Sequence, residues 1–139
     1  MRVFWDTNLF IYLFESYGEQ TDAASDLERR MAQRGDVLFT STITLGELLV
    51  QAKRRFDDVQ AARLREMLGL VASIVPFDER AADRYAAIRA QTNVRGPDAL
   101  QLACAAATGA DLFVTNDDRL SRRIVPGVGI LSSLASVPI

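Results

Sequence analysis

Short apolar segments alternate along this chain with longer segments that have helical periodicity. Five segments have the length and character of β-strands, although Pro76 weakens the third: Arg2–Trp5, Val37–Thr40, Ser73–Phe77, Leu112–Thr115 and Val128–Leu131. Strands that are separated by helices pair in parallel and need helices on both faces of the sheet. The alternation therefore predicts an α/β fold with three layers, a parallel sheet between two layers of helices.

The helical segments between these strands have recognisable starts and stops. We expect helices over Leu9–Phe14, Asp22–Arg34, Ile43–Phe56, the stretch after Asp58 up to Leu68, Glu79–Gln91, Pro97–Gly109 and Asp118–Arg123. Gly35 is a typical C-terminal stop, Thr42 is the expected cap of the third helix, and Pro97 suits a first helical turn. Within Ile43–Phe56, an apolar stripe at helical spacing predicts core residues: Leu45, Leu48, Leu49, Ala52 and Phe56.

Length and bulk composition predict one compact domain over residues 1–139. The chain is 49% hydrophobic and has no repeat, low-complexity tract or long linker. No apolar stretch approaches the length of a membrane span, and the apolar start is too short for a signal peptide core. We therefore expect a cytoplasmic protein with no membrane partner. A pI near 5.1 argues against a protein that coats duplex nucleic acid by bulk charge.

The chain contains no histidine and a single cysteine, Cys104. These counts exclude a Ser-His-Asp triad, an imidazole general base, a disulfide framework and multi-cysteine metal cages. Cys104 lies in an apolar helical segment and is interpreted as a small core residue. Any catalysis must therefore use carboxylates, hydroxyls, arginine, or a hard metal ion that oxygen atoms hold.

Four acidic residues stand at positions where such chemistry could occur. Asp6 and Asp117 directly follow the first and fourth strands, and the carboxyl ends of parallel strands share one edge of a sheet. Glu47 lies early in the third helix and has no cation three or four residues away, and Asp98 opens a strongly apolar helix. Taken singly, each has an ordinary structural explanation as a turn former, a helix cap or a solvated residue.

Together, four unpaired acids at one edge of the sheet must hold either protons or cations. Two carboxylates about 5 Å apart repel by roughly 3 kcal/mol at an effective dielectric constant of about 20. Oxygen ligands without histidine or thiolate favour Mg²⁺ or Mn²⁺ over zinc, and such ions can activate water for attack at phosphorus. The pattern predicts a site for one of these ions.

At these residues the sequence resembles the PIN-domain ribonucleases, in particular the VapC-type toxins of type II toxin–antitoxin pairs. The resemblance covers nearly the whole chain and rests on four motifs in order: Asp6-Thr7-Asn8, Thr42-x-x-x-Gly46-Glu47-Leu48, Asp98-Ala99-Leu100-Gln101-Leu102-Ala103 and Thr115-Asn116-Asp117. It implies a five-stranded parallel sheet in the order 3-2-1-4-5 and Mg²⁺- or Mn²⁺-dependent endonucleolytic cleavage of RNA. It also implies a homodimer and a cognate antitoxin that inserts a segment into the acidic groove.

The resemblance also assigns expected roles to residues. Asp6, Glu47, Asp98 and Asp117 match the catalytic, metal-binding acids, although the adjacent Asp118 leaves the fourth position open. Polar residues that would order these acids or a water are Asn8, Thr115 and Asn116. Arg95 and Arg119 lie close in sequence to the acids and are candidates for contacts with RNA phosphate. The basic runs Arg29-Arg30, Lys53-Arg54-Arg55 and Arg122-Arg123 are interpreted as solvated surface.

Three other functions are compatible with parts of the pattern. A haloacid-dehalogenase-type phosphatase would need Asp-x-Asp after the first strand, but position 8 is asparagine. A non-catalytic α/β module would bind RNA or protein without using the acids. A free-standing RNA-processing nuclease would share the chemistry of the toxin but have no antitoxin.

Overall fold

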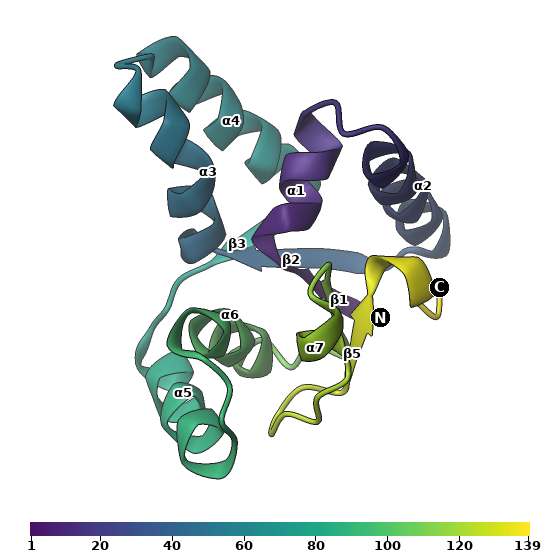
Figure 1. Ribbon diagram of the computed structural model, residues 1–139, viewed down its shortest axis with the longest axis vertical. Helices are drawn as coiled ribbons and strands as arrows, with labels where there is room; N and C mark the ends of the chain where they lie inside the picture. Colours follow the sequence, from purple (N-terminus) through teal and green to yellow (C-terminus); the bar gives the residue numbers. More distant parts are fainter.

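The computed structural model describes all 139 residues and contains one five-stranded sheet (Figure 1). Its strands are β1 (Arg2–Trp5), β2 (Val37–Ser41), β3 (Ser73–Val75), β4 (Leu112–Thr115) and β5 (Ile130–Ser133). They lie in the order β3-β2-β1-β4-β5, and every neighbouring pair is parallel. This architecture confirms the predicted α/β fold and the order 3-2-1-4-5.

Seven α-helices connect and cover the strands: α1 (Thr7–Phe14), α2 (Glu19–Arg34), α3 (Thr42–Arg54), α4 (Asp58–Val71), α5 (Glu79–Gln91), α6 (Gly96–Ala107) and α7 (Asp118–Ser121). A short 3₁₀ turn, Leu134–Ser136, follows the last strand. In Figure 1, α3 and α4 form a hairpin that extends away from the sheet, while α5 and α6 lie on the other side. No helix is long and apolar enough to cross a membrane.

Alternation of side chains along the central strand divides the core between the two faces of the sheet. Val3 and Trp5 of β1 pack into a cluster with Leu9, Phe10 and residues of α2 and α4. Phe4, between them, packs into a second cluster that is built mainly from α5, α6 and the loop before β5. Period-two alternation in a buried strand produces this division, because successive side chains point to opposite faces. Both faces are thus covered, as the three-layer prediction requires.

Several predicted boundaries were wrong by a few residues, for identifiable reasons. β3 stops at Val75 because Pro76 has no N–H for the ladder. β5 begins at Ile130, two residues later than predicted, because Gly127 takes a left-handed conformation (φ 84°) in the turn that precedes it. The cap of α3 is Ser41, whose hydroxyl accepts a hydrogen bond from the Thr44 amide, and Thr42 is the first helical residue.

The prediction of an apolar core stripe on α3 is confirmed for the middle of the stripe and wrong for its last residue. Leu49 and Ala52 are buried, and Leu45 and Leu48 pack partly against the core. Phe56 is 92% exposed. It lies beyond the end of α3, at the tip of the hairpin, with a left-handed backbone conformation (φ 52°). Apolar spacing alone did not predict where the helix would end.

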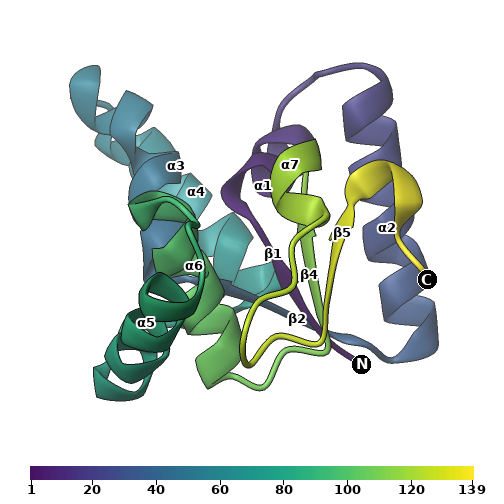
Figure 2. The ribbon, with the colours of Figure 1, turned by 60° about the horizontal axis from the view of Figure 1, so that its bottom comes forward.

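The carboxyl ends of β1 and β4 lie at one edge of the sheet. Figure 2 shows α1 and α7, which begin just after these strands, both starting at this edge. The Asp6 amide donates to the carbonyl oxygen of Val114 at 2.9 Å, which extends the pairing of β1 with β4 to the first acidic residue. The topology therefore brings two residues that are far apart in sequence to the same place.

Candidate functional site

Asp6 is held at the end of β1 by hydrogen bonds to both carboxylate oxygens. Oδ1 accepts from the Thr7 amide at 2.8 Å, and Oδ2 accepts from the Thr115 hydroxyl at 2.9 Å. Burial raises the pKa of Asp6; these two hydrogen bonds oppose the increase, and the charges of Asp98 and Glu47 add to it. The net pKa is above its ordinary value, which shows that the negative charge of this carboxylate is poorly compensated.

Asp98 and Asp117 face the same cavity, which has a volume of about 210 Å³. Asp98 lies in the first turn of α6, where burial raises its pKa and the charge of Asp117 raises it further, against the lowering effect of Arg95. Asp117 caps α7, because its Oδ1 accepts from the amides of Arg119 (2.9 Å) and Leu120 (3.1 Å). The ordinary explanation of Asp117 as a helix cap is therefore correct, but its second oxygen has no partner in the chain.

Glu47 is exposed on α3 and makes no hydrogen bond or ion pair. It is close enough to Asp6 for its charge to raise the Asp6 pKa. It also lines a separate cavity of about 220 Å³ between α1 and the α3–α4 hairpin. The four predicted acids therefore influence one another electrostatically. The charges of Asp98 and Glu47 raise the pKa of Asp6, and the charge of Asp117 raises the pKa of Asp98.

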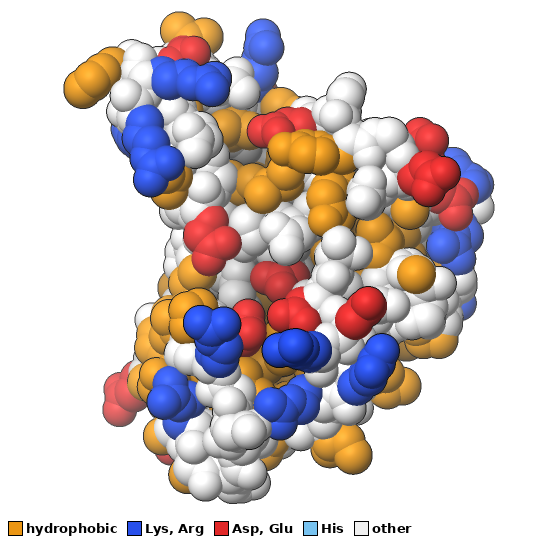
Figure 3. All heavy atoms as spheres, viewed as in Figure 1, with side chains coloured by type: hydrophobic (Ala, Val, Ile, Leu, Met, Phe, Trp, Pro, Cys, Tyr) orange, Lys and Arg blue, Asp and Glu red, His pale blue; other side chains and the backbone are white.

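None of these four acids takes part in a salt bridge. The ion pairs of the chain involve Asp26 and Asp36 instead. In Figure 3, acidic side chains gather around the hollow in the middle of the face, and basic side chains lie beside them. Acids that repel one another and form no salt bridge attract a mobile cation.

The carboxylates fit a divalent cation that keeps part of its water shell. No three of the chain's acidic or thiol side chains are close enough together to hold a metal ion among them. Mg²⁺, however, is commonly bound through one or two carboxylates and several waters. The donor set contains only oxygen, and two of its members have raised pKa values because of burial and mutual repulsion. Mg²⁺ or Mn²⁺ suits such donors better than zinc does.

The predicted supporting residues differ in what they contact. The Thr115 hydroxyl donates to Asp6 and accepts from the Asp117 amide at 3.1 Å, so it connects two of the acids. Asn116 donates to the Tyr12 hydroxyl at 2.7 Å, and no hydrogen bond joins it to an acid. Asn8 is exposed on α1, and its side chain makes no hydrogen bond in the chain. Of the three, Thr115 alone bonds an acid of the set.

Arginines border the cavity that contains Asp98 and Asp117. Arg95 and Arg119, the predicted phosphate contacts, both line it. Arg123, which the sequence pattern assigns to solvated surface, lines it as well. The neighbouring Asp118 does not line the cavity, so Asp117 is the better placed of the two adjacent acids.

A buried polar network beneath the site was not predicted. The Gln101 side-chain amide donates to the hydroxyls of Thr44 (2.8 Å) and Thr7 (3.1 Å), and its oxygen accepts from Ser41 at 2.6 Å. Gln101 thereby ties α6 to the starts of α1 and α3, the three helices next to Asp98, Asp6 and Glu47. The sequence motif contained Gln101, but nothing local indicated that a glutamine in this helix would be buried.

The PIN domain family model matches residues 3–124. No curated protein matches the chain in sequence.

Solved structures similar to this one come from toxin–antitoxin complexes. VapBC2 from Rickettsia felis, bound to a DNA fragment from their promoter, is 20% identical with a TM-score of 0.76, covering 96% of this chain and 98% of that one. DNA-bound VapBC from Salmonella typhimurium is 23% identical with a TM-score of 0.72 over the same shares, 96% and 98%. A toxin–antitoxin complex from Klebsiella pneumoniae is 27% identical with a TM-score of 0.63, covering 91% of this chain and 94% of that one.

The family match extends from the first strand to the segment after α7, and therefore includes every acid of the site. The sheet order and the position of the acids at its carboxyl edge agree with that match. This chain belongs to the PIN domain family.

Proposed function

We propose that this protein is a Mg²⁺- or Mn²⁺-dependent endoribonuclease and the toxin of a toxin–antitoxin pair. The observation that carries the proposal is the set of four acids without salt bridges at the carboxyl edge of a PIN-domain sheet, two of them with raised pKa values. The similarity to toxin–antitoxin complexes over nearly the whole chain supports the assignment as a toxin.

Asp6 and Asp98 are the proposed principal metal ligands, and Glu47 and Asp117 complete the acidic set. A bound ion would lower the pKa of water and stabilise negative charge that develops at phosphorus. Thr115 orients Asp6 by donating to Oδ2, and the Thr7 amide fixes Oδ1. Arg95 and Arg119 line the adjacent cavity, where their guanidinium groups can bind phosphates of the RNA strand next to the cleaved bond.

Replacement of Asp6 tests this proposal. We expect Asp6→Asn to lower Mg²⁺-dependent cleavage of a mixed RNA substrate by at least about a hundredfold, because the charge that attracts the ion is lost. Asp22→Asn, which removes an exposed carboxylate of α2, is the matched control. Circular dichroism verifies that both variants are folded. Cleavage by Asp6→Asn at the wild-type rate would refute the proposal.

The cavity beside Glu47 is the proposed docking place for the antitoxin segment. Apolar side chains from α1, α3 and α4 line it, among them Phe14, Leu48 and Leu64, with Glu47 and Arg55 at its border. A peptide with apolar residues and one cation would match this lining. The gene neighbourhood offers the test: a short adjacent reading frame for a small DNA-binding protein should encode a partner that co-purifies and inhibits cleavage.

Absence of such a partner would favour the free-standing RNA-processing nuclease. Isothermal titration with Mn²⁺ tests the alternative that the protein is a non-catalytic module. On that alternative, Mn²⁺ does not bind, and neutralising the four acids does not change the response to the metal. Assembly as a homodimer is a prediction of the family resemblance, and analytical ultracentrifugation measures it directly.

A further inference from the structure

A third cavity lies away from the acidic edge, at the opposite end of α6, and it is lined by three arginines. Its volume is about 470 Å³, within the range of about 300–1,000 Å³ that is usual for small-molecule sites. Thr108 and Gly109, which follow α6, form part of its wall. Since Asp98 lies ten residues before Thr108 and a helix rises 1.5 Å per residue, about 15 Å of helix separates the cavity from the proposed nuclease site.

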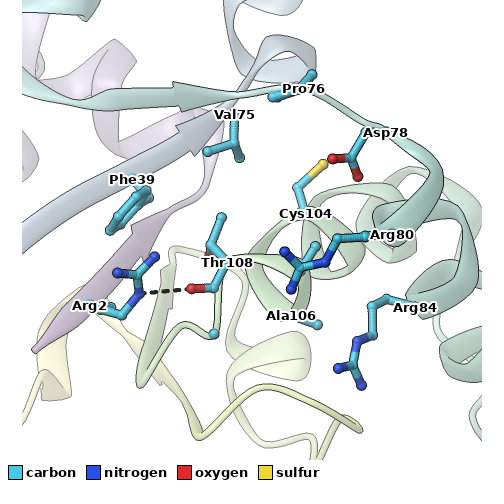
Figure 4. A pocket seen from close by; sticks show the side chains of 12 residues that line it. Arg2, Phe39, Val75, Pro76, Asp78, Arg80, Arg84, Cys104, Ala106 and Thr108 are labelled. Carbon is cyan, nitrogen blue, oxygen red and sulfur yellow. Dashed lines mark hydrogen bonds between the residues drawn. The ribbon is translucent and has the colours of Figure 1, made fainter.

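The arginines come from two different elements and surround the cavity. Arg2 belongs to β1, and Arg80 and Arg84 belong to α5 (Figure 4). Arg80 and Arg84 are four residues apart, and therefore lie on one face of the helix, where two like charges repel by a few tenths of a kcal/mol. Figure 4 shows Arg2 on one side of Thr108 and the other two arginines on its other side.

These guanidinium groups have no carboxylate partner. None of the three takes part in a salt bridge. Arg80 and Arg84 make no side-chain hydrogen bond within the chain, and the Asp78 carboxylate, which also lines the cavity, caps α5 by accepting from the Ala81 amide. Among the residues that line this cavity, three are positively charged and one is negatively charged, while Glu79 and Asp83 line a neighbouring cavity with Arg80 and Arg84. The positive excess at the lining favours an anionic ligand.

Arg2 is held in place before any ligand binds. Its Nε donates to the carbonyl oxygen of Thr108 at 2.7 Å, and its guanidinium group lies 4.5 Å from the centroid of the Phe39 ring. Both Nη groups remain free to donate. Fixing one arginine in advance lowers the entropy that a ligand must overcome, and a guanidinium group with two free nitrogens suits the oxygen atoms of a phosphate.

The remaining wall is apolar, from Phe39, Val75, Pro76 and alanines of α6. The geometry points to a binding site for a phosphate-bearing ligand of about the size of a mononucleotide, with the phosphate at the arginines and the base or sugar against Val75 and Pro76. The same chemistry could be supplied by a free nucleotide or by a nucleotide of a bound RNA strand. This assignment does not depend on the nuclease activity.

Titration of the metal-free protein with AMP, followed by calorimetry, tests the site. We expect one AMP to bind per chain, and the double variant R80A/R84A to bind at least about tenfold more weakly, because two charge-assisted contacts are lost. R63A/R65A removes two exposed arginines of α4 and should bind as the wild type does. Adenosine, which lacks the phosphate, should bind much more weakly than AMP.

Two further measurements localise the site and guard against misfolding. Amide chemical shifts of Thr108 and Gly109 should move when AMP is added. R80K/R84K keeps both charges but loses the paired donors, and should give an affinity between those of the wild type and R80A/R84A. Equal AMP affinity in both alanine double variants, or no AMP binding at millimolar concentration, would overturn the assignment. A changed oligomeric state of R80A/R84A with unchanged AMP affinity would also overturn it, since the arginines would then belong to an interface.

A non-cleavable 2′-O-methyl oligonucleotide distinguishes the two sources of phosphate. If R80A/R84A weakens oligonucleotide binding as well as AMP binding, the strand passes through the cavity. If it weakens AMP binding alone, the ligand is a free nucleotide. Either result supports a phosphate-binding cavity and identifies its source.

Discussion

Asp6 lies in surroundings that favour its protonated form. In the metal-free protein, its raised pKa means that the native state takes up a proton at a higher pH than the unfolded chain does. Such a group destabilises the fold at neutral pH, and this penalty is relieved as the pH falls through the raised pKa toward the ordinary carboxyl value near 3.8. On the proposed function, metal binding requires the charged form of Asp6, whereas the stability of the metal-free fold favours the neutral form.

Asp6→Asn should consequently stabilise the metal-free protein at pH 7, because the variant has no buried charge to desolvate. The advantage of the variant over the wild type should shrink as the pH is lowered toward the ordinary carboxyl pKa, because the wild-type carboxyl takes up its proton at a higher pH in the native state than in the unfolded chain. Urea unfolding of both proteins in EDTA, at several pH values, measures this difference. A difference that grows on acidification would contradict the assigned direction of the pKa shift.

The adjacent acids Asp117 and Asp118 provide a matched pair of single substitutions. Asp117 lines the cavity with Asp98, and Asp118 does not. We expect Asp117→Asn to reduce RNA cleavage by at least about tenfold and Asp118→Asn to have little effect, since an asparagine at 117 keeps the helix cap but loses the charge. Initial rates of RNA cleavage by the two variants at saturating Mg²⁺ show which residue is the fourth acid. A larger loss with Asp118→Asn would reassign the fourth acid.

At the scale of elements, Gln101 joins three helices that the site depends on. Gln101→Leu should cost about 2 kcal/mol or more, because it removes hydrogen bonds from the buried hydroxyls of Thr7, Thr44 and Ser41. Denaturant unfolding measures the loss, with Gln91→Leu at the exposed end of α5 as the control. A double-mutant cycle with Ser41→Ala should give non-additive changes. Additive changes would show that the network does not act as a unit.

At the tip of the α3–α4 hairpin, in contrast to Gln101, replacing a side chain should not destabilise the protein. Phe56 is 92% exposed and has a positive φ of 52°, a conformation that costs most L-residues about 1–2 kcal/mol. Phe56→Gly should therefore leave the stability unchanged or increase it by up to about 1 kcal/mol, although a large apolar side chain is removed. Thermal unfolding of the isolated protein measures this. A clear loss of stability would mean that Phe56 is buried in solution.

The elements that could be predicted were those whose pattern is local. Strand alternation, Gly35 after α2 and the acids after β1 and β4 were all visible in short windows of sequence. Phe56 and Gln101 were not, because their environments depend on where the chain turns and on residues more than 50 positions away. Arg123 follows the end of α7, and no local rule places an exposed loop residue beside a particular cavity.

At the scale of the whole molecule, metal binding and folding should be linked. An ion that binds the native acids and has no site in the unfolded chain stabilises the fold by mass action. We expect saturating Mn²⁺ to raise the wild-type Tm by several degrees and to leave the Asp6→Asn, Asp98→Asn double variant almost unchanged. Differential scanning fluorimetry with EDTA as the reference measures this. An equal shift in both proteins would place the ion elsewhere.

The sheet also determines when during synthesis the acids can meet. Asp6 is bonded to Thr115, which lies 109 residues later, and β1 cannot gain β4 as its neighbour until that late segment exists. Pairing between such distant segments is slow and comes late in folding. A ribosome making this protein therefore carries a chain that lacks the complete acidic set until the segment that contains β4 and Asp117 has been made. On the proposed function, the messenger and the ribosome that produce the nuclease are exposed to its activity only after β4 and Asp117 have been synthesised.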